Sequence, residues 1–353
     1  MMRFSFAPYL LDFKEPGGTS RGVMTEKPTF LVKVFDENDP SRFGIGEAAV
    51  FPGLSPEADG NYVWKLTEVL ANIAIGKGTD LSRHSSIQFG LEQALFDFSN
   101  GCKGIYFPTA FTEGKSEIEI NGLVWMGEFD KMIERIESKM ADGFHCLKLK
   151  IGAIDWKKEV EMIEYVRKRF SSSELMIRVD ANGGFSMENA LPRLKRLADL
   201  DVHSIEQPIP AGNPEMMAFL CSVSPLPIAL DEELIGKATT EERVALLDTV
   251  KPAYIILKPA LCGGFSGGGE WIELANDRGI GWWVTSALES NVGLNSIAQW
   301  TAFMKAEGPQ GLGTGGVFTN NFITPVGLEG DRLHFNPSQP LDYSQFNDLK
   351  WHY

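Results

Sequence analysis

Two lysines lie two positions apart in a short apolar segment: Lys148 and Lys150 in CLKLKIG (146–152). Side chains alternate between the faces of an extended strand, so both ammonium groups are expected on one face and the intervening leucine on the other. Like charges held close together disfavour the doubly protonated state. We therefore expect one lysine of the pair to lose its proton more readily than a free lysine and to act as a base near neutral pH. For the KxK pattern alone, the alternative is a solvated edge strand.

The residues that follow this segment show a regular spacing. Five polar residues each close a short apolar run that precedes a helical pattern. Counted from Lys150, the steps are 30, 26, 25, 27 and 28 residues, and they end at Asp180, Glu206, Asp231, Lys258 and Ser286. A strand, a loop and a helix that recur at this interval predict a (β/α) barrel, which carries its chemistry at the C-terminal ends of its strands.

Three of these residues are carboxylates. Asp180, Glu206 and Asp231 would end strands 3, 4 and 5 of such a barrel. Adjacent buried carboxylates repel one another and are costly to desolvate, so a divalent cation is expected between them. Ligation by oxygen alone, with no histidine nearby, favours a hard ion, Mg²⁺ first and Mn²⁺ second.

Two lysines would flank this metal. Lys150 on strand 2 and Lys258 on strand 6 are expected on opposite sides of the ring. A substrate carboxylate bound to the metal would have its α-carbon between the two ammonium groups. Removal of the α-proton builds an enediolate, which the cation and Lys148 would stabilise as it forms. The pattern thus predicts an enzyme that abstracts a proton next to a carboxylate.

Composition narrows the class of partner. A net charge of −14 and a pI near 4.9 argue against a nucleic acid or an anionic membrane. The sequence contains no run of 18 apolar residues and no signal-peptide pattern. The four cysteines form no CxxC pair, so reduced thiols in a cytoplasmic protein are expected. The expected partner is a small carboxylate substrate, and the oligomeric state stays open.

The chain divides into three predicted parts. Residues 1–118 contain β-rich segments on either side of a Pro/Gly/Ser break at 15–20, and then two helical patterns at 61–74 and 86–100. This order predicts an α+β capping domain that leans over the barrel mouth. Residues 119–318 form the barrel, and residues 319–353 return to the capping domain.

The predicted α/β barrel has eight strands, the number that closes a ring. They are expected at 123–127, 146–152, 175–182, 202–208, 227–234, 253–259, 281–288 and, as the weakest pattern, 310–318. The barrel therefore has either eight full units or seven full units and a modified eighth. Helices are expected between the strands, among them 128–141, 156–170, 186–200, 239–249 and 291–306.

The motifs at the strand ends resemble those of a known family. DAN at 180–182, EQP at 206–208, DE at 231–232 and the KxK pair are similar to the enolase superfamily, in its muconate lactonizing subgroup. The resemblance extends over nearly the whole chain. It implies a barrel with a capping domain, a lysine base and Mg²⁺.

Within the subgroup, two further motifs resemble those of the o-succinylbenzoate synthases of menaquinone biosynthesis. They are SALES (286–290), followed by Gly293, and GLGTGG (311–316). Those lyases dehydrate 2-succinyl-6-hydroxy-2,4-cyclohexadiene-1-carboxylate to 2-succinylbenzoate. The resemblance implies that Lys150 takes the α-proton and then assists departure of the hydroxyl from the same face, while Lys258 offers its cation to the developing ring.

The resemblance also implies a set of substrate contacts. Lys148 and Asn182 would contact the substrate carboxylate or the intermediate. Backbone N–H groups of the loop that contains Gly311 and Gly313 would receive the succinyl carboxylate, because glycines allow close approach of the main chain. The remaining candidates are Thr285 or Ser286, depending on strand register, and Arg21, which would close over the substrate from the capping domain.

Two other functions remain open. The same lysine pair suits an N-succinylamino or N-acylamino acid racemase, and it suits a dipeptide epimerase, although no acidic DxD motif lies near strand 8. A barrel that binds a ligand without turnover is the alternative from another class. Exchange of an α-proton with solvent deuterium would favour the racemase, and dicarboxylate binding without turnover would favour the binding protein.

Overall fold

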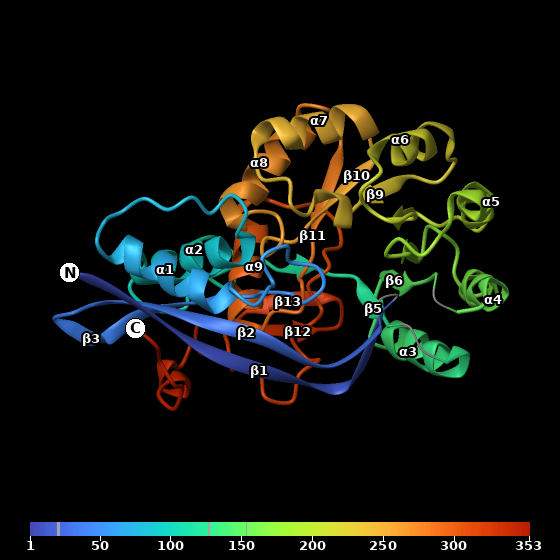
Figure 1. Cartoon of the computed structure of the whole chain (residues 1–353). Coiled ribbons are helices and arrows are strands. Elements are labelled where there is room, and N and C mark those ends of the chain that lie inside the picture. Colours follow the sequence, from blue (N-terminus) through green and yellow to red (C-terminus); the bar gives the residue numbers. More distant parts are fainter. Residues whose placement is uncertain (20–21, 126–127, 153) are drawn as a thin grey trace.

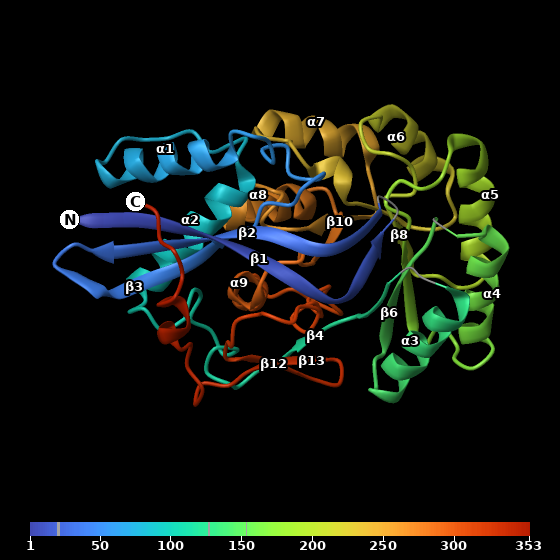
Figure 2. The same ribbon diagram turned by 60° about the horizontal axis from the view of Figure 1, so that its bottom comes forward.

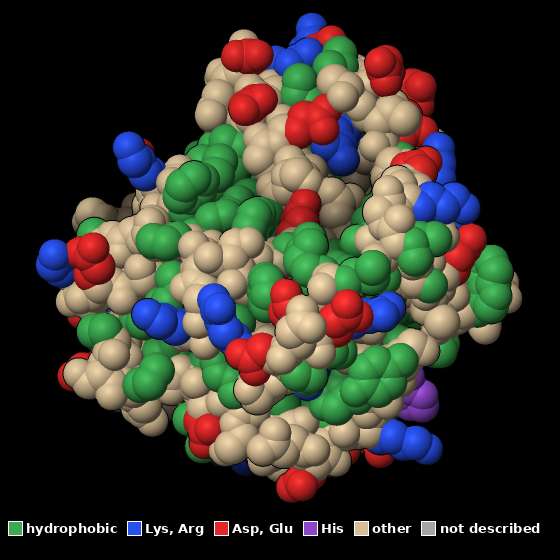
Figure 3. Space-filling model, turned by 90° about the vertical axis from the view of Figure 1, so that its left-hand side faces the viewer, with side chains coloured by type: hydrophobic (Ala, Val, Ile, Leu, Met, Phe, Trp, Pro, Cys, Tyr) green, Lys and Arg blue, Asp and Glu red, His purple; other side chains and the backbone are tan. Residues whose placement is uncertain are grey.

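The computed structural model describes residues 1–19, 22–125, 128–152 and 154–353. Their strands form three sheets (Figure 1). No helix within the described ranges has both the length and the apolar character that a membrane crossing requires. On the face shown in Figure 3, acidic and basic side chains are interspersed with apolar ones.

The N-terminal sheet is antiparallel, in the order β1-β2-β3. Its strands are β1 (Met2–Thr19), β2 (Gly22–Asp36) and β3 (Asp39–Ala48), and the helices α1 (Tyr62–Ala74) and α2 (Ser85–Ser99) follow. The break predicted at 15–20 does not end a strand, because β1 continues to Thr19 after a register shift between Asp12 and Gly17. A local irregularity in the pairing accommodates the Pro-Gly-Gly segment. Arg21 lies outside the described residues.

The central sheet has seven parallel strands whose order follows the sequence from β5 to β11. The strands are β5 (Gly122–Val124), β6 (Cys146–Lys150), β7 (Met176–Asp180), β8 (Ser204–Glu206), β9 (Ile228–Leu230), β10 (Tyr254–Leu257) and β11 (Gly281–Val284). The helices are α3 (Phe129–Ala141), α4 (Trp156–Arg167), α5 (Met187–Ala198), α6 (Pro214–Val223), α7 (Thr240–Val250), α8 (Gly264–Asn276) and α9 (Asn291–Phe303). Figures 1 and 2 show α3 to α8 along the outer side of the curled sheet.

The predicted eighth strand is much shorter than expected. Of residues 310–318, Gln310 pairs in parallel with Ile120 and Gly311 with Thr285, so these two residues lie between β11 and the segment that precedes β5. The rest of the segment forms turns and bends, with a single antiparallel bridge at Phe318. Its glycines explain the difference, because glycine weakens a strand and favours turns.

A third, small sheet joins the C-terminal segment to the start of the barrel. Its order is β12-β13-β4, with β12 (Val326–Glu329), β13 (Arg332–Phe335) and β4 (Ile118–Glu119). The short 3₁₀ helices are η1 (Glu232–Leu234) and η2 (Tyr343–Phe346). Beyond η2 the chain contacts the N-terminal sheet, where His352 pairs with Phe6.

The alternation of side chains on β6 agrees with the prediction. Leu147 and Leu149 belong to the large core cluster formed with the outer helices, whereas Lys148 and Lys150 face the other side. On that inner side, Ala229, Ile256 and Trp283 form a small apolar cluster. Each lies two residues before a polar residue at a strand end, so this cluster forms the floor beneath the polar groups.

Candidate active site

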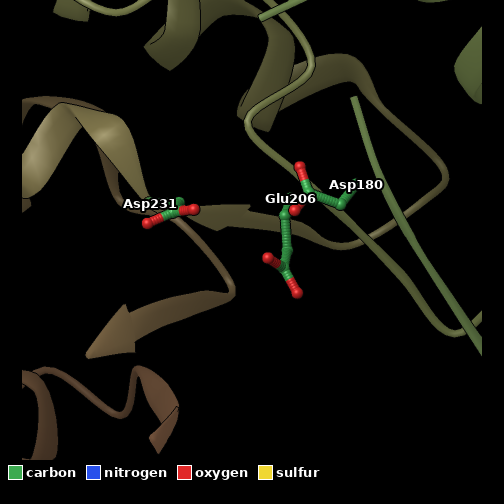
Figure 4. A group of neighbouring side chains, drawn as sticks. All are labelled: Asp180, Glu206 and Asp231. Carbon is green, nitrogen blue, oxygen red and sulfur yellow. The ribbon is translucent and has the colours of Figure 1, made fainter. Parts of the chain in front are cut away.

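Three carboxylates meet at the ends of neighbouring strands. Lys150 pairs with Asp180 across β6 and β7, Asp180 pairs with Glu206 across β7 and β8, and Asp231 directly follows β9. One oxygen from each of Asp180, Glu206 and Asp231 lies within 4.8 Å of the others, and all three side chains are buried (Figure 4). The predicted spacing therefore brings them together.

Lysine ammonium groups surround these carboxylates. Lys148 Nζ donates to Glu206 Oε2 and lies 3.1 Å from Asp180 Oδ2. Lys150 Nζ donates to the same Asp180 oxygen at 2.6 Å. On the far side of the cluster, Lys258 Nζ donates to Asp231 Oδ2 at 2.5 Å. Every carboxylate thus has an ammonium partner.

Nearby carboxylates raise the pKa of two of the lysines. Burial would lower the pKa of Lys148, but the nearby Glu206 and Asp180 carboxylates outweigh it and raise the pKa. The pKa of Lys258 is raised in the same way, because Asp231 offsets the effect of burial. Repulsion between the paired lysines therefore does not lower the pKa of Lys148, because carboxylates lie within contact of its ammonium. That at least one lysine of the pair loses its proton more readily than a free lysine stays a prediction.

The carboxylates respond unequally to burial. Burial alone would raise the pKa of Asp180, but Lys150 and Lys148 hold it well below its usual range. Burial raises the pKa of Glu206 to about 7, despite Lys148 beside it, and it also raises the pKa of Asp231. Three acids in one buried cluster cannot all ionise cheaply without a further positive charge.

The cluster has the donors that a hard cation requires. Glu206 Oε1 is buried and accepts no hydrogen bond from the described residues. A buried carboxylate oxygen without a partner is costly, and a divalent cation would satisfy it. The three carboxylates supply oxygen ligands only, without histidine or cysteine. This buried acidic triad therefore fits a divalent metal ion.

A pocket opens beside the lysines. It brings together eight residues that the sequence singled out: Lys148, Lys150, Asn182, Lys258, Thr285, Ser286, Gly311 and Gly313. Residues that the sequence analysis did not single out complete the wall, among them Met24, Phe51, Leu54, Asn121, Trp125 and Thr314. Met24, Phe51 and Leu54 come from the N-terminal unit, so this unit forms one wall of the pocket.

Both hydroxyl-bearing residues at the end of β11 line the pocket. Thr285 Oγ1 donates to the Gly311 carbonyl at 2.9 Å, and Ser286 Oγ lies 2.7 Å from Thr314 Oγ1. A Cβ added at Gly311 would lie 2.1 Å from Thr285 Oγ1. Glycine is therefore required at 311 for the close approach of these two segments.

The DAN and EQP motifs also have structural roles that the sequence analysis missed. Asn182 adopts a left-handed backbone conformation (φ 42°), accepts from Lys150 Nζ at 2.8 Å and donates to Glu232 at 2.9 Å. Gln207 accepts from the backbone N–H of Asp231 at 3.2 Å. Asn182 thus orients the lysine, and Gln207 positions the strand end that carries Asp231. Asn182 and Gln207 stand in the DAN and EQP motifs, but their hydrogen-bond partners are visible only in the folded structure.

Comparison with known proteins is consistent with this geometry. The family model described as "Enolase C-terminal domain-like" matches residues 131–328. The o-succinylbenzoate synthase of Desulfotalea psychrophila is 45% identical over 94% of this chain and 98% of its own length. The chain belongs to the enolase superfamily. It is an enzyme of that superfamily, and its acidic triad lies where the superfamily pattern predicted it.

Solved structures of superfamily members share the fold. The crystal structure of MenC from Desulfotalea psychrophila has a TM-score of 0.81 and 43% identity, and the match covers 94% of this chain and 99% of that one. The muconate lactonizing enzyme from Pseudomonas putida has a TM-score of 0.77 at 20% identity, with 99% of each chain covered. A further curated relative, the N-succinyl-L-Arg/Lys racemase of Bacillus cereus, is 26% identical over 84% of this chain and 82% of its own length.

Proposed function

We propose that this superfamily member is an o-succinylbenzoate synthase, a lyase that dehydrates 2-succinyl-6-hydroxy-2,4-cyclohexadiene-1-carboxylate to 2-succinylbenzoate in menaquinone biosynthesis. The observation that carries the proposal is the placement of Lys150 and Lys258 in one pocket, on strands separated by the three that bear the carboxylates. The 45% identity to a named o-succinylbenzoate synthase supports the choice of reaction.

Asp180, Glu206 and Asp231 would hold Mg²⁺, with Mn²⁺ as a substitute. The bound ion would stabilise the negative charge that grows on the substrate carboxylate as the α-proton leaves. Lys150 Nζ donates to Asp180 Oδ2 at 2.6 Å, so the proposed base contacts one of the proposed metal ligands.

Lys150 Nζ would take the proton from the carbon that bears the carboxylate. It would then return this proton to the hydroxyl on the same face, so that the C–O bond breaks and water leaves with no net change at the lysine. Lys258 would place its ammonium on the opposite face of the ring, where it balances the developing charge. Lys148 and Asn182 would contact the substrate carboxylate.

The succinyl end of the substrate would lie toward the glycine-rich segment. The Gly311 N–H already donates to the Val284 carbonyl at 2.8 Å, so we assign the approach of the succinyl carboxylate to the loop around Gly313, with Thr285 and Ser286 beside it. Closure of Arg21 over the substrate stays a prediction.

We also propose a division of the chain into three parts: a capping domain (1–118), a barrel (119–318) and a segment that returns to the capping domain (319–353). Residues 310–311 would be the modified eighth strand of the barrel, because their pairing supports ring closure.

An ultraviolet assay for 2-succinylbenzoate formation tests the proposal, with Lys150→Ala as the comparison. Loss of a well-placed base costs roughly 10² to 10⁴ in rate. Mn²⁺ binding to both proteins serves as the control for an intact metal site. Equal rates in the two proteins would remove Lys150 as the base, and an inactive wild-type protein would overturn the proposed reaction.

Racemisation of an N-succinylamino acid is the second candidate. Lys150 and Lys258 both reach the pocket, as a proton exchange on two faces of an α-carbon requires. The N-succinylamino acid racemase of Thermus thermophilus is 27% identical over 78% of this chain. Incorporation of solvent deuterium at the α-carbon, with loss of optical activity, would demonstrate it, and a ligand that binds without any turnover would instead favour a binding protein.

A further inference from the structure

A buried carboxylate of the N-terminal sheet docks at the start of a barrel helix. Glu47, near the end of β3, accepts through Oε1 from Ser290 N at 2.9 Å and from Thr29 Oγ1 at 2.7 Å. Its Oε2 accepts from Ser290 Oγ at 2.5 Å and from Gly293 N at 3.0 Å. Four donors, three of them at the start of α9, thus hold the carboxylate in one place.

The start of α9 is shaped to admit this carboxylate. A Cβ at Gly293 would lie 2.8 Å from Glu47 Oε2, so any larger residue would displace it. The turn before the helix is also constrained, because Leu288 has φ 61° and Glu289 Oε2 accepts from the Ala287 N–H at 2.7 Å. Glu47 therefore contacts a segment that cannot adjust easily.

The two segments joined by Glu47 form adjoining parts of the substrate pocket, where Phe51, Ala287 and Leu288 belong to one apolar cluster. Phe51 and Leu54 follow Glu47 closely in the chain, and Ser286 to Leu288 precede Ser290. Phe51, Leu54 and residues 286–288 line the pocket, whereas Glu47 and Ser290 do not. One carboxylate thus fixes the spacing between a wall of the N-terminal unit and a wall of the barrel.

A second carboxylate makes a comparable contact away from the pocket. Glu92 on α2 accepts from Phe265 N at 2.5 Å at the start of α8. A Cβ at Gly264 would lie 2.4 Å from Glu92 Oε2, which explains the glycine at this position. Neither Glu92 nor Phe265 lines the pocket. Glu92 is therefore a matched control for Glu47. It makes a docking contact between the same two units, but neither it nor its partner lines the pocket.

We propose that Glu47 is a positioning residue that sets the spacing of the two pocket walls and thereby substrate affinity, whereas Glu92 only docks the two units. The inference rests on the proposed function, because turnover of the diene carboxylate is its main readout. The walls contact the substrate before and during the reaction alike, so their displacement weakens ground-state and transition-state binding together. The carboxylates and lysines lie on β6 to β10, away from this contact.

The test compares wild type, Glu47→Gln and Glu92→Gln. Glutamine retains the length of the side chain but presents an N–H₂ group to two of the donors. For Glu47→Gln we expect KM to rise about tenfold or more, the equivalent of about 1.4 kcal/mol, with kcat within about threefold. For Glu92→Gln we expect both constants within about twofold of wild type. Mn²⁺ affinity should be the same in all three proteins.

Several outcomes would overturn the inference. Glu47→Gln with an unchanged KM, or Glu92→Gln with an equal rise in KM, would show that Glu47 has no special role. If Glu47→Gln does not fold, Thr29→Val removes one donor to the same carboxylate and should raise KM in the same direction; an unchanged KM in that variant would overturn the inference.

A readout that needs no substrate separates this inference from the proposed function. We expect faster amide hydrogen exchange at 49–54 and 286–290 in Glu47→Gln than in wild type, and unchanged exchange there in Glu92→Gln. Unchanged exchange in Glu47→Gln would overturn the inference. A wild-type protein without dehydratase activity would overturn the proposed function, and the exchange result would still decide on Glu47.

Discussion

Some ionisable residues in this enzyme lie where burial disfavours their charged form. Glu289 illustrates this: its Oε1 accepts no hydrogen bond within the described part of the chain, and burial raises its pKa to about 7 even with Lys27 nearby. Lys27 is itself buried, with its ammonium 5.9 Å from the centre of the Phe51 ring. The region between the two units thus contains ionisable groups that only the folded state desolvates.

Glu289 should make stability depend on pH. Its pKa is higher in the folded state (about 7) than the reference value of 4.5, so the folded state binds more protons between these values. The contribution to the free energy of unfolding therefore falls as pH rises from about 4.5 to 7, by about 3 kcal/mol at most. Urea unfolding of wild type and Glu289→Gln at several pH values measures this. The wild type should lose stability relative to the variant over that range, and parallel curves would contradict the prediction.

At the scale of elements, the sequence predicts strand ends best where a polar residue closes an apolar run. Asp180, Glu206 and Asp231 obey this pattern, and the structure places all three together. Segments whose conformation depends on distant partners were predicted less well. Residues 15–19 continue a strand only because β2 pairs across the register shift, and 312–317 form turns and bends because glycines allow them.

The parts of the site contributed by tertiary contacts could not be predicted. Nothing in the local pattern of Met24 or Phe51 tells which apolar side chain faces the pocket, because the docking of the N-terminal unit decides it. The lysine pKa values depend in the same way on carboxylates brought near by folding. Lys148 and Lys150 were placed correctly on one face, since that follows from strand geometry alone.

A substitution at Gly311 tests whether stability requires the close approach of β11 and residues 310–311. In Gly311→Ala the new Cβ would meet Thr285 Oγ1 at 2.1 Å, so we expect a loss of about 1–3 kcal/mol in the free energy of unfolding. Gly313→Ala is the matched control, since its Cβ would lie 3.3 Å from the end of the Ile120 side chain, and it should cost less than about 1 kcal/mol. Urea denaturation gives both values, and equal losses would contradict the assignment.

For the whole molecule, the acidic triad should link metal binding to stability. An ion that binds only the folded state adds about 2.7 kcal/mol when its concentration is 100 times its Kd. We therefore expect Mg²⁺ to raise Tm in calorimetry and EDTA to reverse the increase. Asp180→Asn should show a much smaller response, because it removes one of the three carboxylates. An identical Tm with and without Mg²⁺ would argue against a metal at this site.

The two paired residues at 310–311 have a mechanical consequence for the proposed closed barrel. Neighbouring strands of the central sheet are joined over two to five residue pairs, but residues 310–311 make only one bridge on each side among the described residues. The backbone pairs at 310–311 should therefore open in thermal fluctuations before those between the other strands. Because Gly311 also lines the pocket, this weakly paired joint borders the space that has to admit the substrate and release a flatter, aromatic product.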